Sequence, residues 1–247
     1  MTYAVRPDVN GLSDLAHRAE RLRDVTDRSI PIWGVAVHQT GTGIVEQAMK
    51  HNSDPLEYAV AYYFSPDAYF AHYVVGYEGD IWQIADEHER APHVGLDPEE
   101  RQQFLSGVWQ TKLPATFVSA WKARWPGVKS PSYLYPGASA NNAYAGVEMI
   151  PVVNGCGATP LRAGYKYTKA QHNVIAQLAS DIAKRWGFPD NWERTGRLAC
   201  HEDLNPITRS SGGMGWDPGV IRTDPWFDWQ YLLDSISTLK SGGSLVA

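Results

Sequence analysis

Three side chains in this sequence could together hold a divalent metal ion. His38 ends an apolar run of strand character, Ile32–His38, and His201 follows a second short run of this kind, Arg197–Cys200. Asp217 stands in a Gly-Trp-Asp-Pro-Gly turn. Two neutral imidazoles and one carboxylate are a ligand set of catalytic zinc sites, which keep a fourth position for water. The alternative is a purely structural Asp217, because Asp before Pro is common in turns.

The two cysteines do not form a metal site of their own. Neither Cys156 nor Cys200 has a partner at the C-x-x-C spacing that is typical of structural zinc. We expect two free, buried thiols, with a single disulfide between them as the alternative. Cys200 directly precedes His201, and neighbouring side chains of a strand point to opposite faces, so the two are not expected to reach one ion.

Five other histidines are weaker candidates for metal binding or catalysis. His72 lies in a strand pattern, and we expect it to be buried and hydrogen-bonded. Four others lie in polar or helical surroundings and are expected at the surface: His17, His51, His88 and His172.

Strand and helix signals alternate along the chain and must position these side chains. Apolar runs predict strands over Ile32–His38, Tyr69–Gly76, Asp80–Ala85, Ala143–Val152 and Arg197–Cys200, the second and third of which form a hairpin. Helical spacing predicts helices over residues 9–27, Pro55–Phe64, Lys169–Trp186 and Trp226–Leu239. The clearest helix is the third, because Thr168 and Gln171 form a capping box at its start. The pattern predicts a single α/β domain in which helices flank the strands.

A long irregular segment, residues 96–140, interrupts this pattern. It is rich in Pro, Gly, Trp and Tyr and contains two short helical stretches, Pro98–Val108 and Ala115–Arg124.

The composition excludes several classes of protein. Of the 247 residues, 43% are hydrophobic and 20% charged, as in ordinary globular proteins, and 12% aromatic residues argue against disorder. The formal net charge is −5 and no basic run occurs, so nucleic acid is not an expected partner. No apolar stretch approaches the roughly 18 residues of a membrane span, so a membrane is not expected either.

Six short blocks, in order along residues 31–232, resemble those of one enzyme family. They are His38-Gln-Thr-Gly41, Ala71-His-Tyr73 with the strand after it, Ala91-Pro-His-Val-Gly95, Ala145-Gly-Val-Glu148, the helix that begins at Thr168, and Cys200-His-Glu-Asp203 with the later Trp216-Asp-Pro-Gly219. Together they resemble the zinc-dependent N-acetylmuramoyl-L-alanine amidases of the type-2 group. This superfamily also contains phage lysozyme-type amidases and peptidoglycan recognition proteins.

The resemblance implies a fold, a cofactor and a reaction. The fold would be a mixed central sheet flanked by helices, with an insertion at residues 96–140. One Zn²⁺ ion per chain would be held by His38, His201 and Asp217. Glu148 would act as the general base that deprotonates the attacking water. The substrate would be peptidoglycan, cut at the amide between N-acetylmuramic acid and L-alanine.

The sequence departs from the family at several positions. Many relatives carry a lysine two residues before the last ligand, where this chain has Gly215. Arg209 or His93 could take its role at the oxyanion, and His93 is also expected to contact substrate. Asp224 is a rival third ligand, and Asp203 is expected to orient His201.

The insertion has two interpretations that the sequence leaves open. Its large aromatic residues either line a wall of the substrate site or form a small core of their own. These residues are Trp109, Trp121, Trp125, Tyr133 and Tyr135.

We expect a helical extension over residues 1–30, the catalytic domain over 31–240 and a flexible tail over 241–247. The first residues are too polar for a secretory signal peptide, so the protein is expected to be made in the cytoplasm. It would act on the wall in the periplasm after release or delivery, as a bacteriolytic endolysin or an antibacterial effector, or in the cytoplasm as a recycling enzyme. An inhibitor or immunity partner is left open. Alternative functions are muropeptide binding without catalysis and zinc-dependent hydrolysis of another amide.

Overall fold

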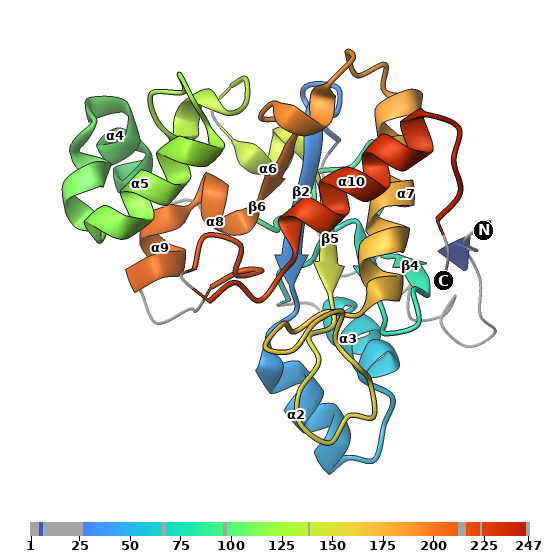
Figure 1. Cartoon of the computed structure of the whole chain (residues 1–247). Helices are drawn as coiled ribbons and strands as arrows, with labels where there is room; N and C mark the ends of the chain where they lie inside the picture. The colour runs from blue at the N-terminus through green and yellow to red at the C-terminus, as the bar shows by residue number, and fades with distance from the viewer. Residues whose placement is uncertain are drawn as a thin grey trace.

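A six-stranded mixed sheet runs through the molecule (Figure 1). The computed structural model describes residues 5–6, 27–65, 68–95, 98–137, 139–211, 216–222 and 224–245. The strands are β1 (Val5–Arg6), β2 (Gly34–Gln39), β3 (Tyr73–Val75), β4 (Ile81–Gln83), β5 (Tyr144–Met149) and β6 (Leu198–Cys200). Their order in the sheet is β1-β4-β3-β5-β2-β6, and all neighbours are parallel except β3 and β4. The mixed α/β fold expected from the sequence is therefore confirmed.

The register of the central strands brings chemistry-bearing residues to one edge. β2 lies between β5 and β6, and His38 is directly opposite Glu148. Because parallel strands end at the same edge of a sheet, His201, the first residue after β6, reaches that edge as well. Ligand sites of open α/β sheets form at this edge.

The helices cover the sheet from both sides (Figure 1). They are α2 (Thr42–Lys50), α3 (Pro55–Tyr63), α4 (Pro98–Ser106), α5 (Ala115–Arg124), α6 (Ala140–Ala143), α7 (Lys169–Arg185), α8 (His201–Leu204), α9 (Pro206–Ser211) and α10 (Trp229–Lys240). The described residues also contain three short 3-10 helices, at Val108–Lys112, Pro131–Tyr133 and Trp192–Arg194. None of the helices in the described part of the chain combines the length and apolar character needed to cross a membrane.

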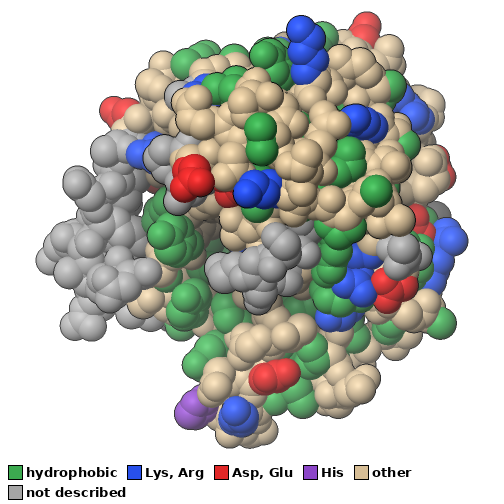
Figure 2. Space-filling view, turned by 90° about the vertical axis from the view of Figure 1, so that its left-hand side faces the viewer, with side chains coloured by type: hydrophobic (Ala, Val, Ile, Leu, Met, Phe, Trp, Pro, Cys, Tyr) green, Lys and Arg blue, Asp and Glu red, His purple; other side chains and the backbone are tan. Residues whose placement is uncertain are grey.

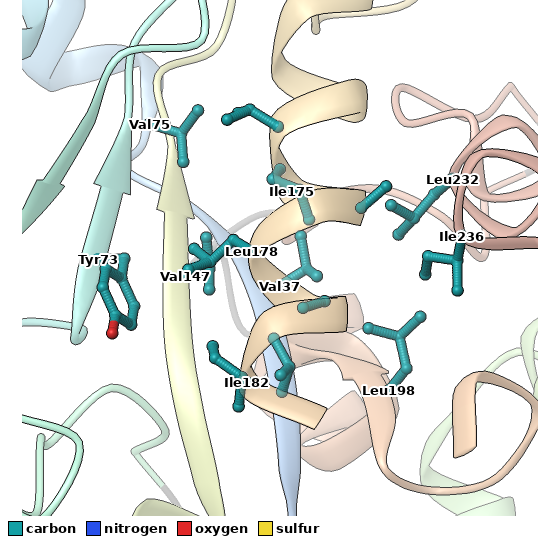
Figure 3. Close-up of a cluster of buried hydrophobic side chains, with 14 of the residues drawn as sticks. Val37, Tyr73, Val75, Val147, Ile175, Leu178, Ile182, Leu198, Leu232 and Ile236 are labelled. Atoms are coloured by element: carbon teal, nitrogen blue, oxygen red, sulfur yellow. The ribbon is translucent and has the colours of Figure 1, made fainter. Parts of the chain in front are cut away.

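The main core fills the space between the sheet and the helices α7 and α10 (Figure 3). Val37 and Val147 point from the sheet toward Leu178 of α7, and Ile236 adds the α10 side. Burial of each such side chain contributes roughly 1.5–3 kcal/mol. The start of α7 is fixed as expected, because the Thr168 side chain accepts from Gln171 N and the Gln171 side chain accepts from Thr168 N.

The insertion builds a second core on the opposite face of the sheet. Trp109 and Trp121 are completely buried, and they join a cluster that includes Ala36 of β2 and Ala199 of β6. Trp125 and Tyr135 are buried in it too, whereas Tyr133 is exposed. Of the two interpretations of these aromatic residues, the packed core is the one that the structure supports. Figure 2 shows the molecule from the side on which the insertion lies. Hydrophobic side chains gather in the middle of this face, above a small lobe.

Several expectations need correction. His172 is completely buried rather than exposed: its ring stacks on Phe227 at 4.3 Å and bonds to Thr168 O and Asp228 N. The last helix starts at Trp229 instead of Trp226, because Asp228 caps it. Helix α2 was not expected at all. By contrast, His72 is buried as predicted, and both His51 and His88 are exposed.

Most of the expected N-terminal extension lies outside the described residues. The helix predicted over residues 9–27 lies outside the described residues, as does His17. Residues 5–6, which precede the predicted helix, form the edge strand β1. At the other end Leu245 packs partly buried against the main core.

Candidate metal centre

The three predicted ligands lie together at the edge of the sheet. Within the described residues, His38, His201 and Asp217 form one buried group whose ligand atoms all lie within 4.8 Å of one another. His38 Nδ1 is 2.9 Å from His201 Nδ1, and Asp217 Oδ2 is 2.9 Å from His201 Nδ1. Asp217 Oδ2 lies 3.8 Å from His38 Nδ1. Two imidazole nitrogens and a carboxylate oxygen therefore converge on one point.

Each ligand is held by the backbone around it. His38 is the fifth residue of β2, a strand buried on both faces. His201 opens α8 directly after β6, so it stands at a junction of strand and helix rather than at a strand end. Asp217 lies in a loop, and its Oδ1 accepts from Gln39 N at 2.6 Å while its carbonyl accepts from Glu202 N at 3.1 Å. The loop is thus bound to both ligand-bearing elements.

The electrostatics of the group favour metal binding. Burial opposes ionisation of Asp217, but His201 and His38 outweigh it and hold the pKa of this carboxyl well below its usual value. Burial lowers the pKa of His201 to about 3, against the opposing pull of Asp217. A metal ion requires a deprotonated carboxylate and neutral imidazoles. Both shifts run in the direction of those states.

Glu148 faces the same space from β5. Its side chain is 8% exposed, and its Oε2 has no hydrogen-bond partner. Burial, and after it the charge of Asp217, raise the pKa of Glu148 well above its usual value, although Arg209 opposes the shift. An unpaired buried oxygen is costly unless a ligand or water satisfies it. Beside three converging ligand atoms, it fits a centre that holds a metal ion and an attacking water.

A phenol that was not predicted from the sequence also lies near this centre. Tyr63 of α3 is buried. Burial raises its pKa well above the usual value, and the charges of Glu148 and Asp217 add to the shift. The pattern of Pro55–Phe64 does not separate Tyr63 from Tyr58 or Tyr62, because only the packing of α3 on the sheet decides which ring points inward.

Arg209 and His93, the two candidates for the oxyanion role, lie next to different members of the ligand group. Arg209 Nε lies 3.2 Å from His201 Nε2, and its Nη1 is 3.8 Å from Asp217 Oδ2, so a cation borders the ligand group. His93 is only 5% exposed and lies against His38, with 2.9 Å between His93 Nδ1 and His38 Nε2. The expected contact of His93 with substrate does not agree with this burial.

The remaining candidates lie apart from the ligands. The Asp224 side chain is 72% exposed and pairs with Arg222, so it is not part of the group. Asp203 bonds to Arg124, Trp125 and Cys200 and not to His201, so its expected role is wrong. Gly215 lies outside the described residues.

Neither thiol takes part in the metal group. Both are free: Cys200 is buried, with its Sγ 2.9 Å from Asp203 Oδ2, and Cys156 is half-buried.

Comparison with known proteins gives one family match. The family model described as N-acetylmuramoyl-L-alanine amidase matches residues 28–220, more than three quarters of the chain, and this range includes all three ligands and Glu148. No curated protein sequence matches the chain.

Two solved structures are similar in fold. The crystal structure of a selenomethionine AmpD derivative is 15% identical, with a TM-score of 0.47, over 86% of this chain and 89% of that one. Staphylococcus aureus hydrolase AmiA in complex with its ligand is 15% identical, with a TM-score of 0.44, over 99% and 98% of the two chains.

Proposed function

The chain belongs to the N-acetylmuramoyl-L-alanine amidase family, and from this premise we propose that it is a zinc amidase of peptidoglycan. It binds one Zn²⁺ ion through His38, His201 and Asp217 and cuts the amide between N-acetylmuramic acid and L-alanine. The observation that carries this proposal is the convergence of three buried ligand atoms within 4.8 Å of one another. Two imidazoles with one carboxylate suit zinc and leave a fourth position for water.

The chain's own residues supply proton transfer and charge. When bound, zinc acidifies a water molecule and polarises the substrate carbonyl. The unpaired Oε2 of Glu148 accepts a proton from the attacking water and returns it to the leaving amine of L-alanine. The guanidinium of Arg209, next to His201 and Asp217, stabilises the negative charge that develops on the carbonyl oxygen. This assigns to Arg209 the part that a lysine plays in many relatives.

The proposal is tested by zinc content together with product analysis. Elemental analysis of the purified protein should give one zinc per chain for the wild type and for Asp224→Ala, and none for His201→Ala. Mass spectrometry of digested sacculi should find free stem peptides only with the zinc-containing proteins. Asp224→Ala is the matched control, because Asp224 is an exposed carboxylate in the same part of the chain.

Each other outcome has a definite meaning. Loss of zinc in Asp224→Ala would show that the third ligand is Asp224 and not Asp217. Zinc without released stem peptides would indicate a recognition module or another amide as the substrate. No zinc in the wild type would overturn the proposed ligand set.

A further inference from the structure

His93 contacts the side of His38 that faces away from the other two ligands. His38 directs Nδ1 toward His201 and Asp217, so its Nε2 is the remaining ring nitrogen. That Nε2 lies 2.9 Å from His93 Nδ1, and the two rings meet edge to face with 4.8 Å between their centroids. The contact is buried, and a hydrogen bond there is shielded from water.

The far side of His93 determines the direction of this hydrogen bond. His93 Nε2 lies 3.2 Å from the carbonyl oxygen of Tyr144, which can only accept. The proton of a neutral His93 is therefore on Nε2, and its Nδ1 is an acceptor. The partner nitrogen, His38 Nε2, must then carry the proton of His38. This leaves the lone pair of His38 on Nδ1, the atom that faces the other ligands.

We propose that His93 is a positioning residue that fixes the tautomer and the ring orientation of the metal ligand His38. It acts through His38 and does not touch the substrate. The inference builds on the zinc site of the proposed function, because a ligand with its proton on Nδ1 could not donate that nitrogen's lone pair to a metal ion.

The surrounding chain is built to hold the His93 ring. A Cβ on Gly146 of β5 would come within 2.7 Å of His93 Cγ, so the glycine leaves the slot that the ring fills. The Asn141 side chain holds the backbone on both sides, since its Oδ1 accepts from His93 N at 3.1 Å and from Val94 N at 2.7 Å. The ring thus has little freedom to turn away from His38.

Zinc affinity provides the first test. Competition with a chelator measures the dissociation constant of zinc for the wild type, His93→Ala, His93→Asn and His172→Ala. We expect His93→Ala to weaken zinc binding about 10–100-fold, as is usual when the hydrogen-bond partner of a ligand is removed. The Oδ1 of Asn takes the place of His93 Nδ1 as an acceptor, so His93→Asn should recover most of the affinity.

The control separates positioning from general destabilisation. His172 is also a completely buried histidine with two hydrogen bonds, and it has no contact with the ligand group. We expect His172→Ala to lower the melting temperature without a change in zinc affinity. The proposal is overturned if His93→Ala binds zinc as tightly as the wild type does, or if His93→Asn is no better than His93→Ala.

A second readout does not depend on zinc or on hydrolysis. Nitrogen-15 NMR of histidine-labelled protein in the presence of EDTA reports which ring nitrogen of His38 carries the proton. We expect the proton on Nε2 in the wild type and a mixture of tautomers in His93→Ala. A wild type with the proton on Nδ1 would contradict the inference even if the amidase assignment holds. Conversely, a wild type that binds no zinc but has the expected tautomer would refute only the proposed function.

Discussion

At the scale of single residues, Glu148 is the side chain where stability and chemistry conflict. Its carboxyl is buried, its Oε2 is unpaired, and its pKa is raised first by burial and then by Asp217. The folded protein therefore favours the protonated form more than the unfolded chain does. As pH rises above the unfolded pKa of about 4.3, ionisation costs the folded state free energy.

The variant Glu148→Gln should consequently gain stability and lose activity. We expect turnover to fall about 10²–10⁴-fold while zinc stays bound, because a general base is lost and no ligand is. In EDTA-treated protein, the variant should match the wild type near pH 4 and become more stable than it as pH rises. Urea unfolding at pH 4, 6 and 8 measures this difference. An advantage that is equal at all three pH values would show that ionisation of Glu148 is not its source.

The sequence indicated that His38, His201 and Asp217 could form one group, and the structure brings them together. It did not indicate which side chains surround them. Short sequence motifs contain His38, His201 and Asp217, and such motifs can be recognised in the sequence alone. The contacts of His93 and Tyr63 depend on which ring packs toward the sheet. That choice is made by residues distant in sequence, such as Gly146, which opens the slot for His93.

At the scale of elements, the helix that carries His201 is braced by the insertion. Asp203 of α8 is completely buried and receives two hydrogen bonds from Arg124 of α5, at 2.7 and 3.0 Å, and one from Trp125 Nε1 at 2.8 Å. Its Oδ2 also accepts from Cys200 N and so caps the helix. An ion pair between the partly buried Arg124 and the completely buried Asp203 therefore connects the insertion to the helix of His201.

Removing the cation of this pair should be strongly destabilising. Arg124→Met leaves the Asp203 carboxylate buried without its cation, and we expect a loss of about 3–5 kcal/mol in the free energy of unfolding. Arg124→Lys should recover only part of this loss, since an ammonium cannot bond both oxygens in the same geometry. Lys122→Met is the control on the same helix: Lys122 is exposed, and a change below about 0.5 kcal/mol is expected. Equal losses at positions 122 and 124 in urea unfolding would contradict this assignment.

His172 joins the two helices of the main core in a pH-dependent manner. Its Nδ1 donates to the carbonyl of Thr168, the N-cap residue of α7, and its Nε2 accepts from the backbone N–H of Asp228, the N-cap residue of α10. Burial lowers its pKa to about 4, although the bond to Thr168 opposes this. The unfolded chain has a pKa near 6.5, so it takes up the proton first as pH falls. Stability contributed by neutral His172 is therefore lost between about pH 6.5 and pH 4, by about 3 kcal/mol in total.

A non-titrating variant should remove this part of the pH dependence. His172→Gln is expected to be less stable than the wild type at pH 7.5 and to lose less further stability on acidification to pH 4.5. Urea unfolding of both proteins across this range gives the two slopes. His51→Gln, at an exposed position, should keep the wild-type slope. An unchanged slope in His172→Gln would show that another group is responsible.

The helices show why some elements could be predicted better than others. α7 has a complete capping box and apolar residues at four-residue spacing, so its bounds follow from local signals. The surface expectation for His172 is wrong because α7 packs on the sheet and on α10 at once, which buries more than one stripe. α2 was not predicted because its N-cap residue, Gly41, offers no side chain to cap the helix and its second residue is Gly43.

At the scale of the whole molecule, the insertion is part of the fold and not an appended module. Its large side chains pack in one cluster with Ala36 and Ala199, the small residues of β2 and β6 that face it. The sequence left this open, because an aromatic-rich segment gives no sign of the surface it will cover. Ala36 and Ala199 are far apart in the sequence. Only their neighbouring positions in the sheet show that both pack against the insertion.

Removing the insertion should therefore prevent the rest of the chain from folding. We expect a chain in which residues 98–137 are replaced by a short Gly-Ser linker to lack a cooperative unfolding transition and to bind no zinc. The loss combines exposure of the sheet face around Ala36 with loss of the Arg124 contact to the His201 helix. Leu105→Ser, a change of an exposed residue within the insertion, should leave the transition and zinc binding intact. A shortened chain that unfolds cooperatively and still binds zinc would instead mark the insertion as separable, and the metal centre would then be held by the sheet and its other helices alone.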